Sequence, residues 1–269
     1  VMKHSFFKTK KSLGQNFLID KNILKKIVST IKVRDNDIFE IGGGKGALTN
    51  FISMEHPKSI KVIEKDNNLY EILSKKYSKN KNIKILKGDI LKFNLENNLS
   101  KNSIIFGNLP YNIATKIFTN LLTKISWPPK YKFLILMFQK EVGEKIIAEF
   151  KTKNYGRLSL ISNFRLEVLK KFIVSKNCFF PKPKVDSMVI YFKPIVNSKH
   201  KIKEIRNLEK ISNIFFSNRR KMINKTMNKL FMNPEKIYKK INILPSSRPS
   251  DINNQKFFEL VEAYEKEGN

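Results

Sequence analysis

The sequence contains few cysteines, few histidines and no long apolar run, and each shortage excludes a class of protein. A single cysteine, Cys178, rules out an internal disulfide and a cysteine-cluster zinc site. The three histidines lie far apart, so no metal-site spacing is present and we expect no metal. The longest purely apolar run, residues 133–138, is six residues long, whereas a membrane span needs about 20. We therefore expect no membrane association.

The beginning of the chain lacks acidic residues and also lacks the apolar stretch of a secretory signal. We expect a reduced, cytoplasmic protein. An organelle is the alternative, because an acid-free basic arm also resembles the remnant of a targeting segment. Residues 1–19 are interpreted either as a solvated arm or as an arm that contacts RNA. Nothing in the sequence indicates an obligate dimer, so we expect a monomer.

Acidic residues are scarce overall: 23 Asp and Glu stand against 53 Lys and Arg, a net charge of +30. Such an excess favours binding to a polyanion, because Lys and Arg neutralise phosphates and release counterions. Only seven of the basic residues are arginine, while lysine, asparagine and isoleucine abound. An AT-rich genome produces the same composition through codon usage, so charge alone does not decide the function.

Glycine is scarce as well, which makes its distribution informative. Only ten glycines occur in 269 residues, and four of them fall within residues 42–46. Backbone freedom is therefore expected to matter at that place.

β-Rich and helix-like segments alternate along the first two thirds of the chain. Alternation of this kind predicts βαβ units and a parallel sheet with helices on both faces. We expect a seven-stranded, mostly parallel, doubly wound α/β sheet with an added hairpin at its end. The expected strands are residues 37–41, 60–64, 83–87, 104–107, 132–138, 166–174 and 187–193.

The pattern changes after Pro194, where a polar, basic stretch is followed only by helical periodicity. We expect a main domain over residues 1–198 and a small helical domain over residues 199–269. The second carries 16 basic and 8 acidic residues, a charge of +8, which leaves +22 on the first.

The glycine cluster lies between a strand and a helix, in IFEIGGGKGALT at 38–49. Glycines there let a ligand approach backbone N–H groups at the helix terminus. Glu64 ends the next strand, where a carboxylate can accept both ribose hydroxyls of an adenosine, and Asp89 follows the third strand. A dinucleotide site needs G-x-G-x-x-G, but Gly42, Gly44 and Gly46 give G-x-G-x-G, typical of S-adenosylmethionine loops. A nicotinamide-dependent oxidoreductase is therefore disfavoured.

The segment NLPY, residues 108–111, follows the fourth expected strand and resembles the motif of methyltransferases that act on exocyclic amines. The amide oxygen of Asn108 and a backbone carbonyl of Leu109 or Pro110 can accept N–H bonds from adenine N6. Those bonds hold the nitrogen in line with the methyl donor and stabilise its developing charge. Tyr111 offers a ring on which the base can stack.

On these residues the chain resembles the ribosomal RNA small-subunit adenine dimethyltransferase family. Further segments resemble that family over almost the whole length. They are SLGQNFLID (12–20), FQKEVGEKI (138–146), NYGRLSL (154–160), CFFPKPKVDSMVIYF (178–192) and FSNRRKMINKTM (216–227). Gly43 stands where the family commonly has proline, so we expect a less rigid loop and a modest loss of preorganisation.

The resemblance implies roles for individual residues. It implies an S-adenosylmethionine site formed by Asn16, Leu18, Gly42, Gly44, Glu64, Asp89 and Asn108. It implies that Phe179 stacks on the target base opposite Tyr111, although a core aromatic is the alternative. It also implies RNA contacts for Arg157, Arg219, Arg220 and Lys221, although a solvated surface is the alternative for each.

The resemblance further implies the reaction and the partner. The protein is expected to methylate N6 of two adjacent adenosines in a hairpin near the 3′ end of small-subunit rRNA. The products would be N6,N6-dimethyladenosine and S-adenosylhomocysteine, made on an immature small ribosomal subunit. Two alternatives remain: a large-subunit methylase of the erythromycin-resistance type, and a non-catalytic assembly or transcription factor on the same fold.

Overall fold

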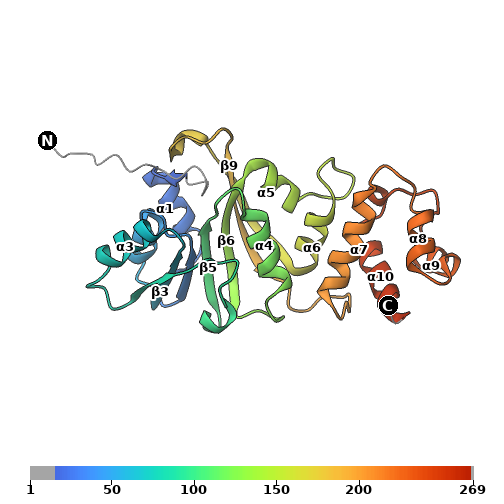
Figure 1. Ribbon diagram of the computed structural model, residues 1–269, viewed down its shortest axis with the longest axis horizontal. Helices are drawn as coiled ribbons and strands as arrows, with labels where there is room; N and C mark the ends of the chain where they lie inside the picture. Colours follow the sequence, from blue (N-terminus) through green and yellow to red (C-terminus); the bar gives the residue numbers. More distant parts are fainter. Residues whose placement is uncertain (1–15, 268–269) are drawn as a thin grey trace. The chain divides into compact units, whose positions relative to one another are not determined.

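The computed structural model describes residues 16–267, and its main element is a seven-stranded sheet (Figure 1). The strand order across the sheet is β4-β3-β2-β5-β6-β9-β7. The first five strands of this order pair in parallel, whereas β9 runs antiparallel to β6. The strands are β2 (Asp37–Ile41), β3 (Ser59–Glu64), β4 (Ile83–Lys87), β5 (Ser103–Asn108), β6 (Tyr131–Gln139), β7 (Leu166–Val174) and β9 (Ser187–Pro194). The predicted α/β sheet is therefore confirmed.

Helices connect the strands and form most of the C-terminal part of the chain. The α-helices are α1 (Lys21–Ser29), α2 (Ala47–Met54), α3 (Asn67–Lys76), α4 (Ala114–Thr123), α5 (Lys140–Ile146), α6 (Arg157–Arg165), α7 (Ile205–Ser217), α8 (Asn224–Leu230), α9 (Pro234–Ile241) and α10 (Asn254–Lys266). Short 3₁₀ helices occur at η2 (Glu96–Asn98), η3 (Lys176–Cys178) and η4 (Pro249–Asp251).

The central strands are apolar along their whole length because helices cover both faces of the sheet. In β5, residues Ser103 to Gly107 are all buried. One core cluster joins Ile38 and Ile104 of the sheet to Ile27 of α1, Ile52 of α2 and Leu73 of α3. This packing fixes the carboxyl ends of β2, β3, β4 and β5 along one edge of the sheet.

Local capping explains where the first helices begin. The Asp20 side chain accepts hydrogen bonds from the backbone N–H groups of Asn22 and Ile23 at the start of α1. Asp66 caps α3 in the same way, accepting from Asn68 and Leu69.

A second, two-stranded sheet was not predicted. β1 (Phe17–Leu18) pairs antiparallel with β8 (Phe179–Phe180). Two-residue strands have no periodicity to read, so the sequence gives no local signal for them. Of the arm predicted over residues 1–19, the first fifteen residues lie outside the described residues.

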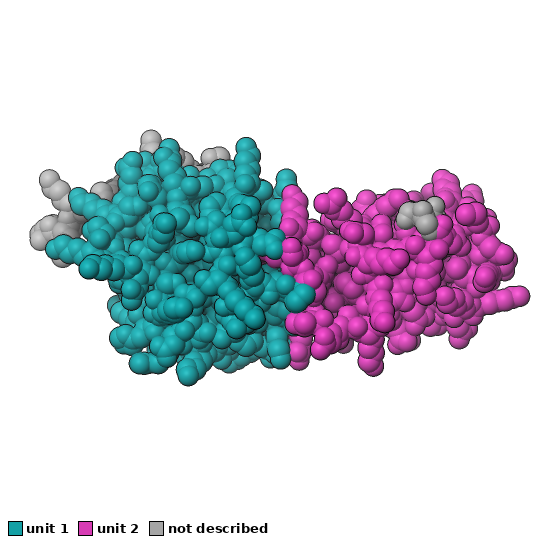
Figure 2. Space-filling model, turned by 90° about the horizontal axis from the view of Figure 1, so that it is seen from below, with its two compact units in different colours: residues 1–120, 128–143, 168–194 teal, residues 121–127, 144–167, 195–269 magenta. Residues whose placement is uncertain are grey.

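The described chain groups into two compact units, coloured separately in Figure 2. Unit 1 runs through residue 120 and adds residues 128–143 and 168–194, and unit 2 holds residues 121–127, 144–167 and 195–269. Within unit 2, Phe164 of α6 packs edge to face on Phe258 of α10, with ring centroids 5.2 Å apart. These units do not coincide with the division at residues 198 and 199, which stays a prediction about function.

Candidate active site

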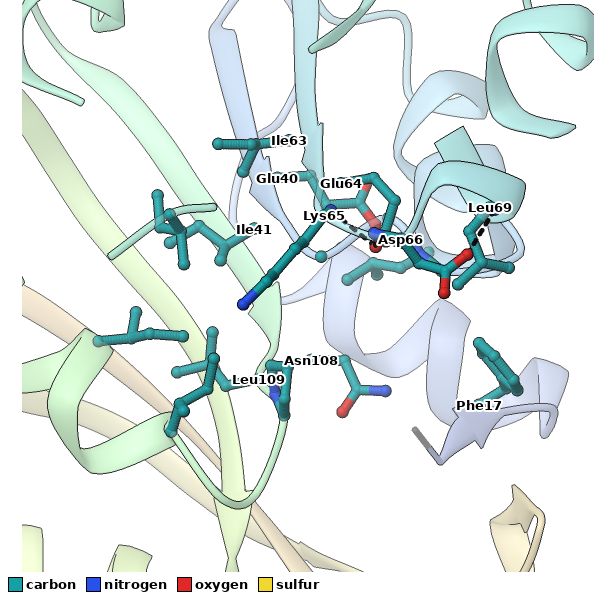
Figure 3. A pocket seen from close by; sticks show the side chains of 18 of the residues that line it. Phe17, Glu40, Ile41, Ile63, Glu64, Lys65, Asp66, Leu69, Asn108 and Leu109 are labelled. Carbon is teal, nitrogen blue, oxygen red and sulfur yellow. Dashed lines mark hydrogen bonds between the residues drawn. The ribbon is translucent and has the colours of Figure 1, made fainter. Parts of the chain in front are cut away.

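A cavity opens at the carboxyl ends of β2, β3, β4 and β5, within unit 1 (Figure 3). The strand order reverses between β2 and β5, and ligands of such sheets bind at that switch point. Most of the residues predicted for the cofactor and the target amine line this cavity. They are Asn16, Leu18, Gly42, Gly44, Glu64, Asp89, Asn108, Leu109, Pro110 and Tyr111.

The glycine loop brings its backbone close to several side chains. Gly44 has a positive φ of 56°, and a Cβ there would lie 3.2 Å from the Phe17 ring, so both its conformation and its surroundings favour glycine. Gly42 also has a positive φ, of 77°, and a Cβ there would lie 3.8 Å from the backbone oxygen of Asn108. The loop therefore lies directly beside the NLPY segment.

Gly43 has a different reason to be glycine. A Cβ at this position would lie 2.5 Å from Cγ1 of Val62 and 2.8 Å from Cδ1 of Leu73. β3 and α3 thus occupy the space that a larger residue would need. The steric fit accounts for glycine in this chain, and the predicted loss of loop rigidity stays a prediction.

Glu64 is tied to the glycine loop by backbone hydrogen bonds. One carboxylate oxygen accepts from the Gly44 N–H at 2.9 Å, and the other accepts from Lys65 at 2.8 Å and Asp66 at 2.9 Å. Burial raises the pKa of Glu64, and these hydrogen bonds act in the opposite direction. Only 8% of the residue is exposed, and it lies in the cavity wall. These hydrogen bonds therefore fix the orientation of the predicted ribose acceptor.

Glu40, at the carboxyl side of β2, is almost fully buried at 1% exposure. Its carboxylate accepts a 2.6 Å hydrogen bond from the Thr49 hydroxyl of α2. Burial raises the pKa of Glu40 to about 8, against a smaller lowering effect of that hydrogen bond. Besides Glu40, which keeps its proton at neutral pH, the cavity wall holds three acidic residues, Glu64, Asp66 and Asp89, and two lysines, Lys45 and Lys65. Such a lining suits a ligand that carries positive charge and hydroxyl groups.

Asp89 follows β4 and is engaged by a neighbour. Its carboxylate forms a 2.9 Å ion pair with Lys65 and accepts a hydrogen bond from the Leu91 N–H at 3.0 Å. These partners lower the pKa of Asp89, the Lys65 hydrogen bond being the largest cause. Asp89 is therefore held as a carboxylate facing the cavity.

The NLPY segment is held at both ends. The Asn108 side-chain nitrogen donates to the backbone oxygen of Asn16 at 3.2 Å. At the other end, the Tyr111 hydroxyl and the Ser187 hydroxyl share a 2.6 Å hydrogen bond. The Pro110 carbonyl accepts from the Ile113 N–H at 3.1 Å, which favours the Leu109 carbonyl as the backbone acceptor for an incoming amine.

Phe179 is the one predicted catalytic residue that does not line the cavity. It is 3% exposed and belongs to the core cluster, whereas its neighbour Phe180 is 61% exposed. Strand alternation explains the difference, because successive side chains point to opposite faces. The stacking role of Phe179 stays a prediction.

The predicted RNA-contacting residues all belong to unit 2. Arg157 pairs with Glu209 at 3.1 Å, and Arg219 donates to the Thr152 carbonyl at 3.4 Å. Arg220 and Lys221 are exposed. Their contact with RNA stays a prediction.

Several lining residues were not predicted: Phe17, Lys45, Lys65, Asp66 and Ile90. Asp66 had a readable signal, since D-N-N-L after a strand is a helix start. The ion pair of Lys65 had none, because it joins side chains that follow different strands.

Two features are absent from residues 16–267. No helix there is long and apolar enough to cross a membrane. Within the same residues, no group of three or more His, Cys, Asp and Glu side chains is arranged to hold a metal ion.

Comparison with known proteins shows where the chain belongs. The profile of the family described as "Ribosomal RNA adenine dimethylase" matches residues 6–266. Ribosomal RNA small subunit methyltransferase A of Pelagibacter ubique is 44% identical over 97% of this chain and 98% of its own length. The protein of that name from Malacoplasma penetrans is 36% identical over 97% of this chain and 93% of its own length.

Solved structures share the fold. A dimethyladenosine transferase from Plasmodium falciparum matches with a TM-score of 0.76 at 24% identity, covering 94% of this chain and 98% of its own. The 23S rRNA methyltransferase ErmE matches with a TM-score of 0.67 at 20% identity, covering 93% of this chain and 99% of its own. From the profile and the sequence relatives together, the chain belongs to the ribosomal RNA adenine dimethylase family of S-adenosylmethionine-dependent methyltransferases.

Proposed function

We propose that the protein transfers methyl groups from S-adenosylmethionine to N6 of adenosines in small-subunit rRNA, giving N6,N6-dimethyladenosine. One observation carries the proposal: the glycine loop and the NLPY segment meet at the switch point, with position 42 beside the backbone oxygen of Asn108. A methyl-donor site and an amine site are thereby adjacent. The names of the relatives at 36% and 44% identity favour the small subunit as the source of the RNA.

The cofactor site is assigned from the residues that line the cavity. S-adenosylmethionine supplies an electrophilic methyl group on a sulfonium. The carboxylate of Glu64 is assigned to the ribose hydroxyls, and the carboxylate of Asp89 to the adenine end. The glycine loop lets a ligand approach backbone N–H groups closely, and a side chain at Gly44 would press on the Phe17 ring, which also lines the cavity. The acidic lining fits the positive charge of the donor.

The target amine is assigned to Asn108 and Leu109. In the first of the two transfers, the Asn108 side-chain oxygen and the Leu109 carbonyl accept hydrogen bonds from the two N6–H groups, which directs the nitrogen lone pair at the methyl carbon. The N–C bond forms as the C–S bond breaks, and S-adenosylhomocysteine leaves. The nitrogen then loses a proton to water, so no ionisable general base is needed before transfer. Tyr111 stacks on the base, with Phe179 as its predicted counterpart.

We also propose the RNA substrate, the docking surface and the oligomeric state of the protein. The substrate is a pair of adjacent adenosines in a hairpin near the 3′ end of the RNA, on an immature small subunit. Residues 199–269, with Arg219, Arg220 and Lys221, dock on that particle, and Arg157 adds a contact. The protein acts as a monomer without a metal, in the cytoplasm, with an organelle as the alternative.

The decisive experiment is transfer of labelled methyl groups to unmethylated small ribosomal subunits. Naked large-subunit rRNA and the Asn108→Ala variant are run in parallel. We expect label as dimethyladenosine in the small subunit and loss of label with the variant. Label only on large-subunit RNA would reassign the protein to the resistance methylases. Tight binding without any transfer would indicate a non-catalytic assembly factor.

A further inference from the structure

The ribbon formed by β1 and β8 has two different faces. Phe17 pairs with Phe180 and Leu18 with Phe179, and the Ile19 N–H continues the ladder by donating to Cys178 at 2.9 Å. Directly opposite residues share a face, and successive residues alternate. Phe17, Ile19 and Phe180 therefore lie on one face, which we call the ribbon face.

Burial separates the two faces clearly. Leu18 and Phe179 are only 4% and 3% exposed, whereas Ile19 and Phe180 are 57% and 61% exposed. Single exposed apolar side chains are ordinary, but here two lie on one face with a third, Phe17, that lines the cofactor cavity. The ribbon face thus continues the wall of the active site out into solvent.

The rim of the ribbon face is basic. Lys182 and Lys184 follow Phe180 and are exposed. The nearby acids are already engaged: Asp20 caps α1, and the Asp186 carboxylate accepts from the Lys176 N–H at 2.9 Å. An exposed aromatic ring beside unpaired positive charge is how proteins bind single-stranded nucleic acid, by stacking on a base and attracting its phosphates.

We propose that the ribbon face, with Phe180 at its centre, stacks on an unpaired nucleotide of the RNA next to the target adenosine. This rests on the proposed function. Phe17 lines the same cavity as Asn108 and pairs with Phe180 across the ribbon, so a nucleotide next to a base held at Asn108 would be within reach of Phe180. The ribbon face would then hold the RNA strand in place while the target base occupies the site.

Two substitutions separate the aromatic ring from apolar bulk. Phe180→Leu keeps an apolar side chain but removes the ring, and Phe180→Tyr keeps the ring. The matched control is Leu169→Ala, at another exposed apolar position of unit 1, on β7. Each variant is assayed for affinity to a short hairpin RNA with two adjacent loop adenosines, for S-adenosylmethionine affinity by calorimetry, and for KM and kcat of methyl transfer.

We expect Phe180→Leu to weaken RNA binding about tenfold, the typical effect of losing one stacked base. The RNA affinities of Phe180→Tyr and Leu169→Ala should stay within about twofold of the parent's. Cofactor affinity should not change, and the loss should appear in KM rather than kcat. The slope of log affinity against log salt should also stay the same, because no phosphate contact is removed.

Unchanged RNA affinity in Phe180→Leu would overturn the proposal, as would equal losses in the leucine and tyrosine variants. A parallel fall in cofactor affinity would show a structural role instead. Binding to anionic lipid vesicles is measured alongside, and its loss in Phe180→Leu with RNA binding intact would overturn the proposal and assign the ribbon face to a membrane. RNA binding is measured separately from methyl transfer, so failure of the proposed reaction in the parent protein is distinguishable from failure of this proposal.

Discussion

At the residue scale, the Glu64 carboxylate is predicted to be needed for S-adenosylmethionine binding, because it accepts hydrogen bonds from the glycine loop and is the proposed ribose acceptor. Glu64→Gln replaces an acceptor oxygen by an NH2 group and removes the charge, so at least one of the three backbone hydrogen bonds is lost. Hydrogen bonds to charged groups contribute about 1.5–3 kcal/mol, so we expect S-adenosylmethionine binding to weaken by roughly tenfold or more. Calorimetry measures this, with Glu71→Gln, at an exposed position of α3, as the matched control. Equal affinity in parent and variant would remove Glu64 from the ribose role.

Tyr111 is predicted to depend on Ser187 for its orientation. The two hydroxyls share a 2.6 Å hydrogen bond, and Ser187 is fully buried. Tyr111→Phe and Ser187→Ala each remove that bond while leaving the aromatic ring in place. We expect each to lower methyl transfer by several-fold, and the double variant to be no worse than the stronger single one, because coupled residues are not additive. Multiplied losses would show that the two residues act independently.

Glu40 is predicted to make stability depend on pH. Its pKa is raised from 4.5 to about 8, so the folded state keeps a proton that the unfolded state releases. The resulting stabilisation is complete below the unfolded pKa of 4.5 and is lost as pH rises towards 8. Relative to Glu40→Gln, we expect the parent to lose roughly 1 kcal/mol of unfolding free energy per pH unit in that window. Urea titrations of both proteins at about pH 5, 6, 7 and 8 give the unfolding free energy as a function of pH. Parallel pH curves for the parent and Glu40→Gln would contradict the prediction.

At the element scale, the close packing of β3 and α3 against the glycine loop is predicted to make a side chain at position 43 destabilising in this chain. Gly43→Ala places a Cβ within 2.5 Å of Val62, so overpacking should cost about 1–3 kcal/mol of unfolding free energy. Val62→Ala removes the contacting atom, and the double variant should recover part of the loss. Urea midpoints measure all three proteins. Strictly additive costs would show that the two positions do not meet.

An element could be predicted from the sequence when the residues that determine it lie close together along the chain. The seven strands were predicted because apolar runs are local signals. The roles assigned to Asn108 and Glu64 followed from their places after strands, and both line the cavity. The β1–β8 ribbon was not predicted, since it joins segments about 160 residues apart through two pairs only. The orientation of Phe179 and Phe180 depends on that pairing, so it was hidden too.

At the scale of the whole molecule, the charge of +30 leaves open which basic residues bind RNA. Codon usage alone would spread lysines over every surface, whereas a binding site concentrates its contribution in particular residues. Arg219 and Arg220 are adjacent in a chain with seven arginines. Arginine also forms paired hydrogen bonds with phosphate that lysine does not. If codon usage alone explains the charge, removing two positive charges anywhere should weaken RNA binding equally. If Arg219 and Arg220 form a binding site, removing those two should weaken it more.

Replacing Arg219 and Arg220 with Gln tests this difference against Lys239→Gln/Lys240→Gln on α9 of the same unit, which removes the same charge. Each lost phosphate contact lowers the slope of log affinity against log salt by about 0.7–0.9. We expect the arginine variant to flatten that slope by about 1.5 and to weaken rRNA binding at low salt. The lysine variant should change the slope far less. If both variants flatten it equally, net charge and not this arginine pair governs binding, and the basic composition reflects the genome more than the site.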